Sequence, residues 1–138
     1  QPKLRRTEYR MSEGWLHQVA LRGDGILTIK PRPQNAGYQT LVLDLDGAFD
    51  RITAMKLKKR IESYLQTSTG NLAINFSGLT TIDRDILFLF FERLLGYKER
   101  IKIISIDSLR AEMADVVNYA KNYFEVIMDV ESLTTESA

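Results

Sequence analysis

The chain has 138 residues, of which 44% are apolar and 27% are charged, the composition of one globular domain of ordinary size. Its net charge of +1 argues against strong attraction to nucleic acid or to an acidic membrane surface. It contains no Cys and a single His, His17, which excludes disulfides, thiolate catalysis and Cys-based zinc sites. We therefore expect no metal site, no cofactor and no catalytic relay built on histidine.

The sequence gives no sign of a membrane segment. The longest uninterrupted apolar run covers residues 86–91, whereas a spanning helix needs about 20 residues. No signal-peptide pattern precedes this run. We expect a cytoplasmic protein that does not insert directly into a membrane.

The first part of the chain is predicted to form an antiparallel hairpin. Residues 1–14 are polar and irregular and are interpreted as a tail or linker. Apolar and polar side chains alternate over residues 15–21, as in a strand. Residues 22–25, with two glycines, are typical of a tight turn, and residues 26–30 form the returning strand. A loop is predicted for residues 31–37.

The remainder alternates between apolar strands and amphipathic helices. Strands are predicted at residues 38–46, 72–76, 101–106 and 126–128, and helices at residues 52–66, 83–97 and 107–122. This order predicts an α/β fold in which helices connect parallel strands, with the N-terminal hairpin as an antiparallel edge. We assign residues 15–138 to a single domain with a mixed open sheet and flanking helices. Its parts are the hairpin and loop, residues 15–37, and the α/β core, residues 38–130.

One short motif resembles an enzyme family. Asp44, Asp46 and Gly47 follow an apolar strand, as in the first motif of haloacid-dehalogenase-type phosphatases. In those enzymes the first Asp is the nucleophile and the second is the general acid/base, both beside Mg²⁺. Asp44 and Asp46 are the catalytic residues in this alternative. Against it, Ala48 replaces the usual Thr or Val, and no later strand presents the acids that hold Mg²⁺.

A longer series of motifs, covering residues 41–130, is similar to the STAS family. The matching motifs are Leu45-x-Gly47-x-Phe49-Asp50, then Thr53-Ala54, Leu79-x-x-Ile82-Asp83 and Ile101-Lys102-Ile103-Ile104. STAS domains are found in anti-sigma-factor antagonists and in the tails of sulfate transporters. The resemblance implies a non-enzymatic regulatory or scaffolding module of bacterial signalling, and leaves the cytoplasmic tail of an anion transporter as an alternative. Asp44 and Asp46 are then strand-end residues without chemistry.

The resemblance also implies a class of partner, and it shows that the usual phosphorylation site is absent from this chain. The implied partners are a switch kinase or anti-sigma factor, a transporter, or other STAS chains, including a second copy, and not nucleic acid. Family members carry Asp-Ser-Ser or Asp-Ser-Thr before the central helix, and the first hydroxyl accepts a phosphate. Here the tripeptide is Asp83-Arg84-Asp85, so phosphorylation at the usual position is absent. Asp83 is predicted to cap the helix, and Arg84 either pairs with Asp83, Asp85 or Glu92 or lies in solvent.

The loop before the central helix and one face of that helix are the expected partner-binding surface. Arg84, Phe88, Phe91 and Leu95 recur at helical spacing and form a second stripe beside the apolar residues that face the sheet. This stripe either docks a partner or is buried under the N-terminal segment, by Trp15 or by the hairpin. The loop hydroxyls either satisfy backbone groups or accept a phosphate. The candidate partner-binding residues are Ser77, Thr80, Thr81, Asp83, Arg84, Asp85, Phe88, Phe91 and Leu95.

Overall fold

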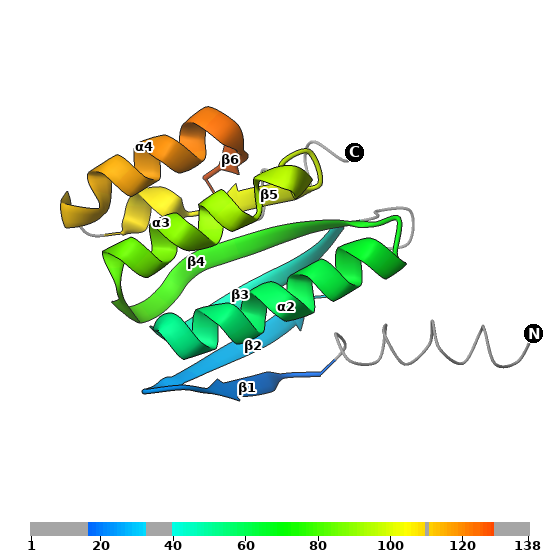
Figure 1. Ribbon diagram of the computed structural model, residues 1–138, viewed down its shortest axis with the longest axis horizontal. Helices are drawn as coiled ribbons and strands as arrows, with labels where there is room; N and C mark the ends of the chain where they lie inside the picture. Colours follow the sequence, from blue (N-terminus) through cyan, green and yellow to red (C-terminus); the bar gives the residue numbers. More distant parts are fainter. Residues whose placement is uncertain (1–16, 33–39, 110, 129–138) are drawn as a thin grey trace, which may run out of the picture.

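The computed structural model describes residues 17–32, 40–109 and 111–128. Within these ranges the chain forms one six-stranded sheet whose strand order follows the chain (Figure 1). The strands are β1 (Val19–Arg22), β2 (Ile26–Arg32), β3 (Thr40–Phe49), β4 (Asn71–Ile82), β5 (Ile101–Ile104) and β6 (Glu125–Ile127). β1, β2 and β3 pair antiparallel, whereas β3, β4, β5 and β6 pair parallel. The predicted mixed α/β sheet with an antiparallel N-terminal hairpin is confirmed.

Three helices in the described part of the chain pack on one face of this sheet (Figure 1). They are α2 (Arg51–Thr67), α3 (Arg84–Arg93) and α4 (Ala114–Tyr123), with short 3-10 turns at Leu95–Tyr97, Ile106–Ser108 and Ala111–Met113. Alternate strand residues, such as Leu43, Ile74 and Ile103, meet the apolar stripes of the helices in one buried core. α3 lies between α2 and α4 (Figure 1).

Aromatic rings hold α3 against the sheet. The Phe90 ring meets the Phe49 ring of β3 edge-on at a centroid distance of 5.1 Å. Phe91 lies 5.6 Å from Phe76 of β4 and 5.7 Å from Phe124, which follows α4. Such tilted ring pairs add to the free energy gained by burying the rings. These contacts pack the C-terminal half of α3 against β3, β4 and the residue that follows α4.

Several predicted boundaries differ from the structure. A loop was expected after residue 76, but β4 continues to Ile82 because residues 78–82 pair with β3 across two register shifts. α3 ends at Arg93, four residues before its predicted end, and a 3-10 turn follows. Asp107 and Ser108 do not begin the last helix; α4 starts at Ala114 without a side-chain cap.

Other predictions fall partly outside the described residues. These include the tail at residues 1–14, Trp15, and most of the loop at residues 31–37, whose first two residues belong to β2. No helix in the described ranges is both long and apolar enough to cross a membrane.

Candidate protein-interaction site

The predicted site is centred on the junction of β4 and α3. We define the β4–α3 corner as residues 77–85. Asp83 follows β4, and its backbone N–H donates to the carbonyl of Phe49 at 3.3 Å, which continues the pairing with β3. Its carboxylate accepts the backbone N–H groups of Asp85, at 3.0 Å, and Ile86, at 3.1 Å. The prediction that Asp83 caps the helix is confirmed, because these bonds satisfy donors that have no partner within the helix.

Arg84 lies between two carboxylates. Its Nη1 donates to Asp85 Oδ1 at 2.6 Å, and its Nε donates to Asp115 Oδ1 at 3.2 Å, with Nη2 bonded to the second oxygen of Asp115. The hydrogen bonds from Arg84 lower the pKa of Asp115, and those bonds raise the pKa of Arg84. The predicted pair with Asp85 is confirmed. Asp115, in the first turn of α4, was not foreseen.

The nine candidate residues do not form one surface. Ser77, Thr80, Thr81, Asp83, Arg84 and Asp85 are all exposed and lie within the β4–α3 corner. Phe88 and Leu95 are half-buried, and Phe91 is completely buried. The inclusion of Phe91 among surface residues is therefore wrong.

α4 covers the stripe that was expected to dock a partner. The ring of Phe88 lies 4.7 Å from that of Tyr119 in α4, and Phe91 points into the core. In the described residues β1 packs on α2, and the neighbour of Phe88 is Tyr119 of α4 and not the hairpin. Trp15 lies outside the described residues. The available part of the predicted surface is the β4–α3 corner.

The hydroxyl groups of this corner include one with a clear structural partner. Thr80 Oγ1 donates to the carbonyl of Gly47 at 3.2 Å, as expected if loop hydroxyls satisfy backbone groups. A Cβ atom at position 78 would lie 2.5 Å from the carbonyl oxygen of Leu45, so Gly78 permits the close approach of β3 and β4.

The two aspartates of the phosphatase alternative lie on the sheet face opposite the helices. They are inside β3 and not at its end, which corrects their predicted position. Asp44 accepts two hydrogen bonds from Arg32, at 2.6 and 2.8 Å, and one from Asn75 at 2.8 Å; Asp46 pairs with Lys30 at 3.1 Å. The described residues contain no group of three or more acids and histidines that could hold a metal ion. Asp44 is thus held by donors on both oxygens, unlike a nucleophile poised to attack.

The architecture matches solved structures although the sequence is distant from them. No protein-family model matches the sequence, and no curated protein matches it either. SpoIIAA, an anti-sigma factor antagonist in its unphosphorylated form, is similar with a TM-score of 0.54 and 15% identity over 78% of this chain and 94% of that chain. A serine-to-glutamate variant of RsbS from Moorella thermoacetica is similar with a TM-score of 0.54 and 12% identity, over 79% and 93%. The chain therefore has the fold of the STAS-domain anti-sigma-factor antagonists.

Proposed function

We propose that this chain is a non-enzymatic regulatory module that binds a protein partner through the β4–α3 corner. A switch kinase or anti-sigma factor and another STAS chain are the proposed partners, with a transporter as a further one, and the proposed location is the cytoplasm. The fold shared with anti-sigma factor antagonists supports a regulatory role. The exposure of six polar residues at this corner supports placing the binding surface there.

We further propose that phosphorylation after Asp83 does not control this module. Arg84 stands where the STAS resemblance implies an acceptor hydroxyl, and the observation that carries the proposal is its fixed position between Asp85 and Asp115. A phosphate would place about two negative charges at the start of α3. Here Arg84 instead keeps a constant positive charge beside Asp85 of the corner and Asp115 of α4, because arginine does not lose its charge at physiological pH.

Partner binding tests the position of the surface. The tagged domain is used to capture proteins from the source cell, and the affinity of the captured partner is then measured for wild type, Arg84→Glu and Lys98→Glu. Lys98 is exposed and lies beyond α3, so it provides a matched reversal of charge away from the corner. We expect Arg84→Glu to weaken binding by about tenfold or more and Lys98→Glu to leave it unchanged. Equal affinities for all three proteins would move the interface elsewhere.

Kinase treatment tests the missing switch. Wild type and Arg84→Ser are incubated with a captured kinase and ATP, and intact mass spectrometry counts the phosphates. Arg84→Ser restores a hydroxyl at the implied acceptor position, so we expect it to gain one phosphate while wild type gains none. A phosphate on Thr80 or Thr81 of the wild-type protein would contradict an unswitched module.

A direct assay addresses the enzyme alternative. Phosphate release from p-nitrophenyl phosphate is measured with Mg²⁺ for wild type and Asp44→Asn. We expect the two proteins to give the same background rate, because Arg32 and Asn75 already bond both oxygens of Asp44. Metal-dependent turnover that disappears in Asp44→Asn would establish catalysis instead.

A further inference from the structure

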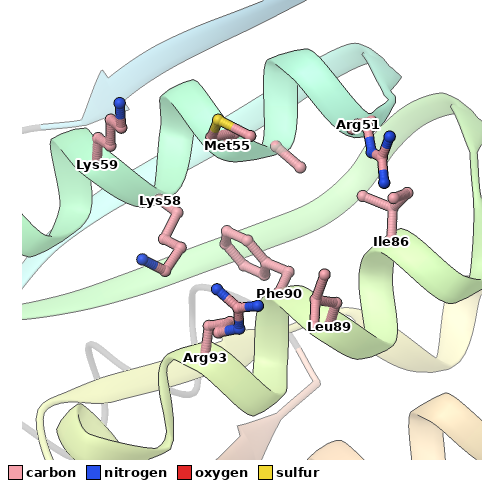
Figure 2. Close-up of a pocket in the computed structure, with 9 residues that line it drawn as sticks. Arg51, Met55, Lys58, Lys59, Ile86, Leu89, Phe90 and Arg93 are labelled. Atoms are coloured by element: carbon pink, nitrogen blue, oxygen red, sulfur yellow. The ribbon is translucent and has the colours of Figure 1, made fainter.

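A second surface lies on the other side of α3, where α3 meets α2. These helices border a groove of about 490 Å³ (Figure 2). Its apolar lining comes from both helices: Ala54, Met55, Ile86, Leu89 and Phe90. Met55 is 52% exposed and Leu89 is 39% exposed, so the monomer leaves part of this lining in contact with water. Exposed apolar side chains gathered in a hollow are typical of a binding surface.

The charged residues around this groove share one sign. Its rim contains Arg51, Lys58, Lys59 and Arg93, and no acidic residue among the described ones lines it. Arg51 lies near Ile86 at one end, and Lys58 and Arg93 lie on either side of Phe90 toward the other end (Figure 2). Lys58 also pairs with Glu62 at 3.0 Å.

The other three rim cations are not neutralised by any residue that the structure describes. Arg51, Lys59 and Arg93 make no ion pair within the described part of the chain. The chain as a whole carries a net charge of only +1. The positive charge at the groove is therefore a local feature, and it favours an occupant with negative charges placed on both sides of an apolar strip.

We propose that this groove binds an acidic amphipathic helix of a protein partner. A helix laid between α2 and α3 places apolar side chains at i, i+3, i+4 and i+7 over Met55, Leu89 and Phe90. Its flanking carboxylates then meet Arg51 at one end and Arg93 at the other. The ten residues of α3 span about 15 Å, which matches almost three turns of the incoming helix.

A concave shape favours a helix over a lipid surface. A membrane-binding surface presents apolar side chains that reach into the bilayer beside its cations. Here the apolar residues border a hollow between α2 and α3, with Met55 and Leu89 partly exposed and Phe90 buried, and the cations line the same hollow. The groove and the β4–α3 corner meet at Ile86, whose N–H donates to Asp83, but Arg84 turns toward Asp115 of α4 while Leu89 and Phe90 line the groove beside α2. The proposal therefore does not depend on the function proposed for that corner.

A synthetic helix provides the direct test. The probe is a capped peptide of about 14 residues with Leu at i, i+3, i+4 and i+7 and Glu at the flanking positions, and its control has Gln in place of every Glu. The peptides are titrated into the ¹⁵N-labelled domain. We expect the Glu peptide to shift the amide signals of α2 and α3 that border the groove and to bind at least about tenfold more tightly than the Gln peptide.

Matched variants locate the charge effect. Arg51→Glu removes a rim cation and places an acid in the first turn of α2, where the helix dipole favours it, so weaker binding does not report unfolding. Lys98→Glu makes a matched charge reversal at an exposed site outside the groove. We expect a loss of about fivefold or more for Arg51→Glu and no loss for Lys98→Glu. Leu89→Ala should also weaken binding, because it removes apolar contact while keeping a strong helix former.

Three results would overturn the proposal. The first is an absence of shifts around the groove with the Glu peptide, or equal binding of the Glu and Gln peptides. The second is that the domain does not bind the peptide but sediments with vesicles containing phosphatidylserine, and that Arg51→Glu prevents this sedimentation. That result would assign the groove to membrane binding. The third is a dimer in analytical ultracentrifugation that Arg51→Glu dissociates, which would assign the groove to a second copy. The capture experiment with Arg84→Glu is independent of all three.

Discussion

Two helices of this domain begin after a parallel strand with an aspartate, and the two aspartates have different surroundings. Asp50, before α2, accepts the N–H groups of Ile52 and Thr53 at 3.0 Å and of Gly25 at 2.9 Å. Its own N–H donates to the Thr53 hydroxyl at 2.9 Å. Asp83, before α3, is exposed, and among the described residues its carboxylate accepts only the two N–H groups of its own helix.

This difference distinguishes the start of α2, which is covered by another part of the chain, from the start of α3, which is open to a partner. The bond to Gly25 connects Asp50 to the turn of the β1–β2 hairpin, so the start of α2 is covered by another part of the chain. Nothing in the described residues covers Asp83 in this way, and its neighbour Arg84 reaches sideways to α4. Both aspartates stand between a strand and the helix that follows it. Asp50 stabilises a contact with the distant β1–β2 turn, whereas Asp83 remains part of an exposed polar surface.

The largest effect on stability is expected for Asp50→Ala. The substitution removes three hydrogen bonds and leaves a partly buried N–H of Gly25 without an acceptor. We expect the free energy of unfolding to fall by about 2 kcal/mol, the upper end for an N-cap. Urea denaturation followed by circular dichroism measures it. A loss no greater than that caused by Asp83→Ala would remove the distinction between the two corners.

Acid should weaken the Asp50 corner. Burial opposes ionisation of Asp50, but hydrogen bonds from the backbone N–H groups of Thr53, Gly25 and Ile52 together lower its pKa. A carboxyl with a lowered pKa stabilises the folded state above its unfolded pKa of about 3.9, and this stabilisation is lost as the pH falls through the folded value. The free energy of unfolding of wild type, measured by urea denaturation, should therefore fall toward that of Asp50→Asn as the pH drops from 6 to about 3. If the two proteins differ in free energy of unfolding by the same amount across this pH range, the charge of Asp50 does not contribute to stability.

A smaller effect is expected for Asp83→Ala. Two hydrogen bonds are lost, both at an exposed helix end where water can replace them. We expect a decrease of about 1 kcal/mol in the free energy of unfolding. The same denaturation experiment measures it, and Asp83→Asn is the control that keeps an accepting oxygen. A decrease as large as that of Asp50→Ala would indicate that the β4–α3 corner is also structural.

The smallest effect on stability is expected for Arg84→Ala. The ion pairs of Arg84 with Asp85 and Asp115 are exposed, and such pairs contribute little to folding. We expect the thermal midpoint to stay at the wild-type value, and its response to added salt to stay the same. A clear drop in the midpoint would show that the contact between α3 and α4 depends on this pair, and the role of Arg84 would then be structural.

The sequence was sufficient for the order of elements but not for the extent of β4. Gly78 and the hydroxyl residues around it are typical of a turn, so a loop was predicted there. Thr80, Thr81 and Ile82 also suit a strand, and pairing with β3 decides between the two. Register shifts beside Asp46 and Gly47 let that pairing continue, and no pattern within residues 77–82 reports them.

The site could be predicted in part for a related reason. Local sequence determines the cap at Asp83, so the start of α3 was predicted correctly, whereas the binding role of the corner stays a prediction. Periodicity within α3 showed which side chains share a face, but it did not show that α4 would cover Phe88 or that Phe91 would reach the core. Asp115 lies 31 residues from Arg84, and an acid in the first turn of a helix is too common a signal to identify the pair.

The six described strands lie side by side in the sheet in the same order in which the ribosome makes them. Each strand pairs with the one synthesised just before it, so no later strand has to insert between two that have already joined. Pairing between consecutive strands keeps the loop closures local, and each parallel pair closes over a single connecting α-helix. Within the described residues, the nascent chain can therefore extend one edge of the sheet strand by strand, from the β1–β2 hairpin to β6.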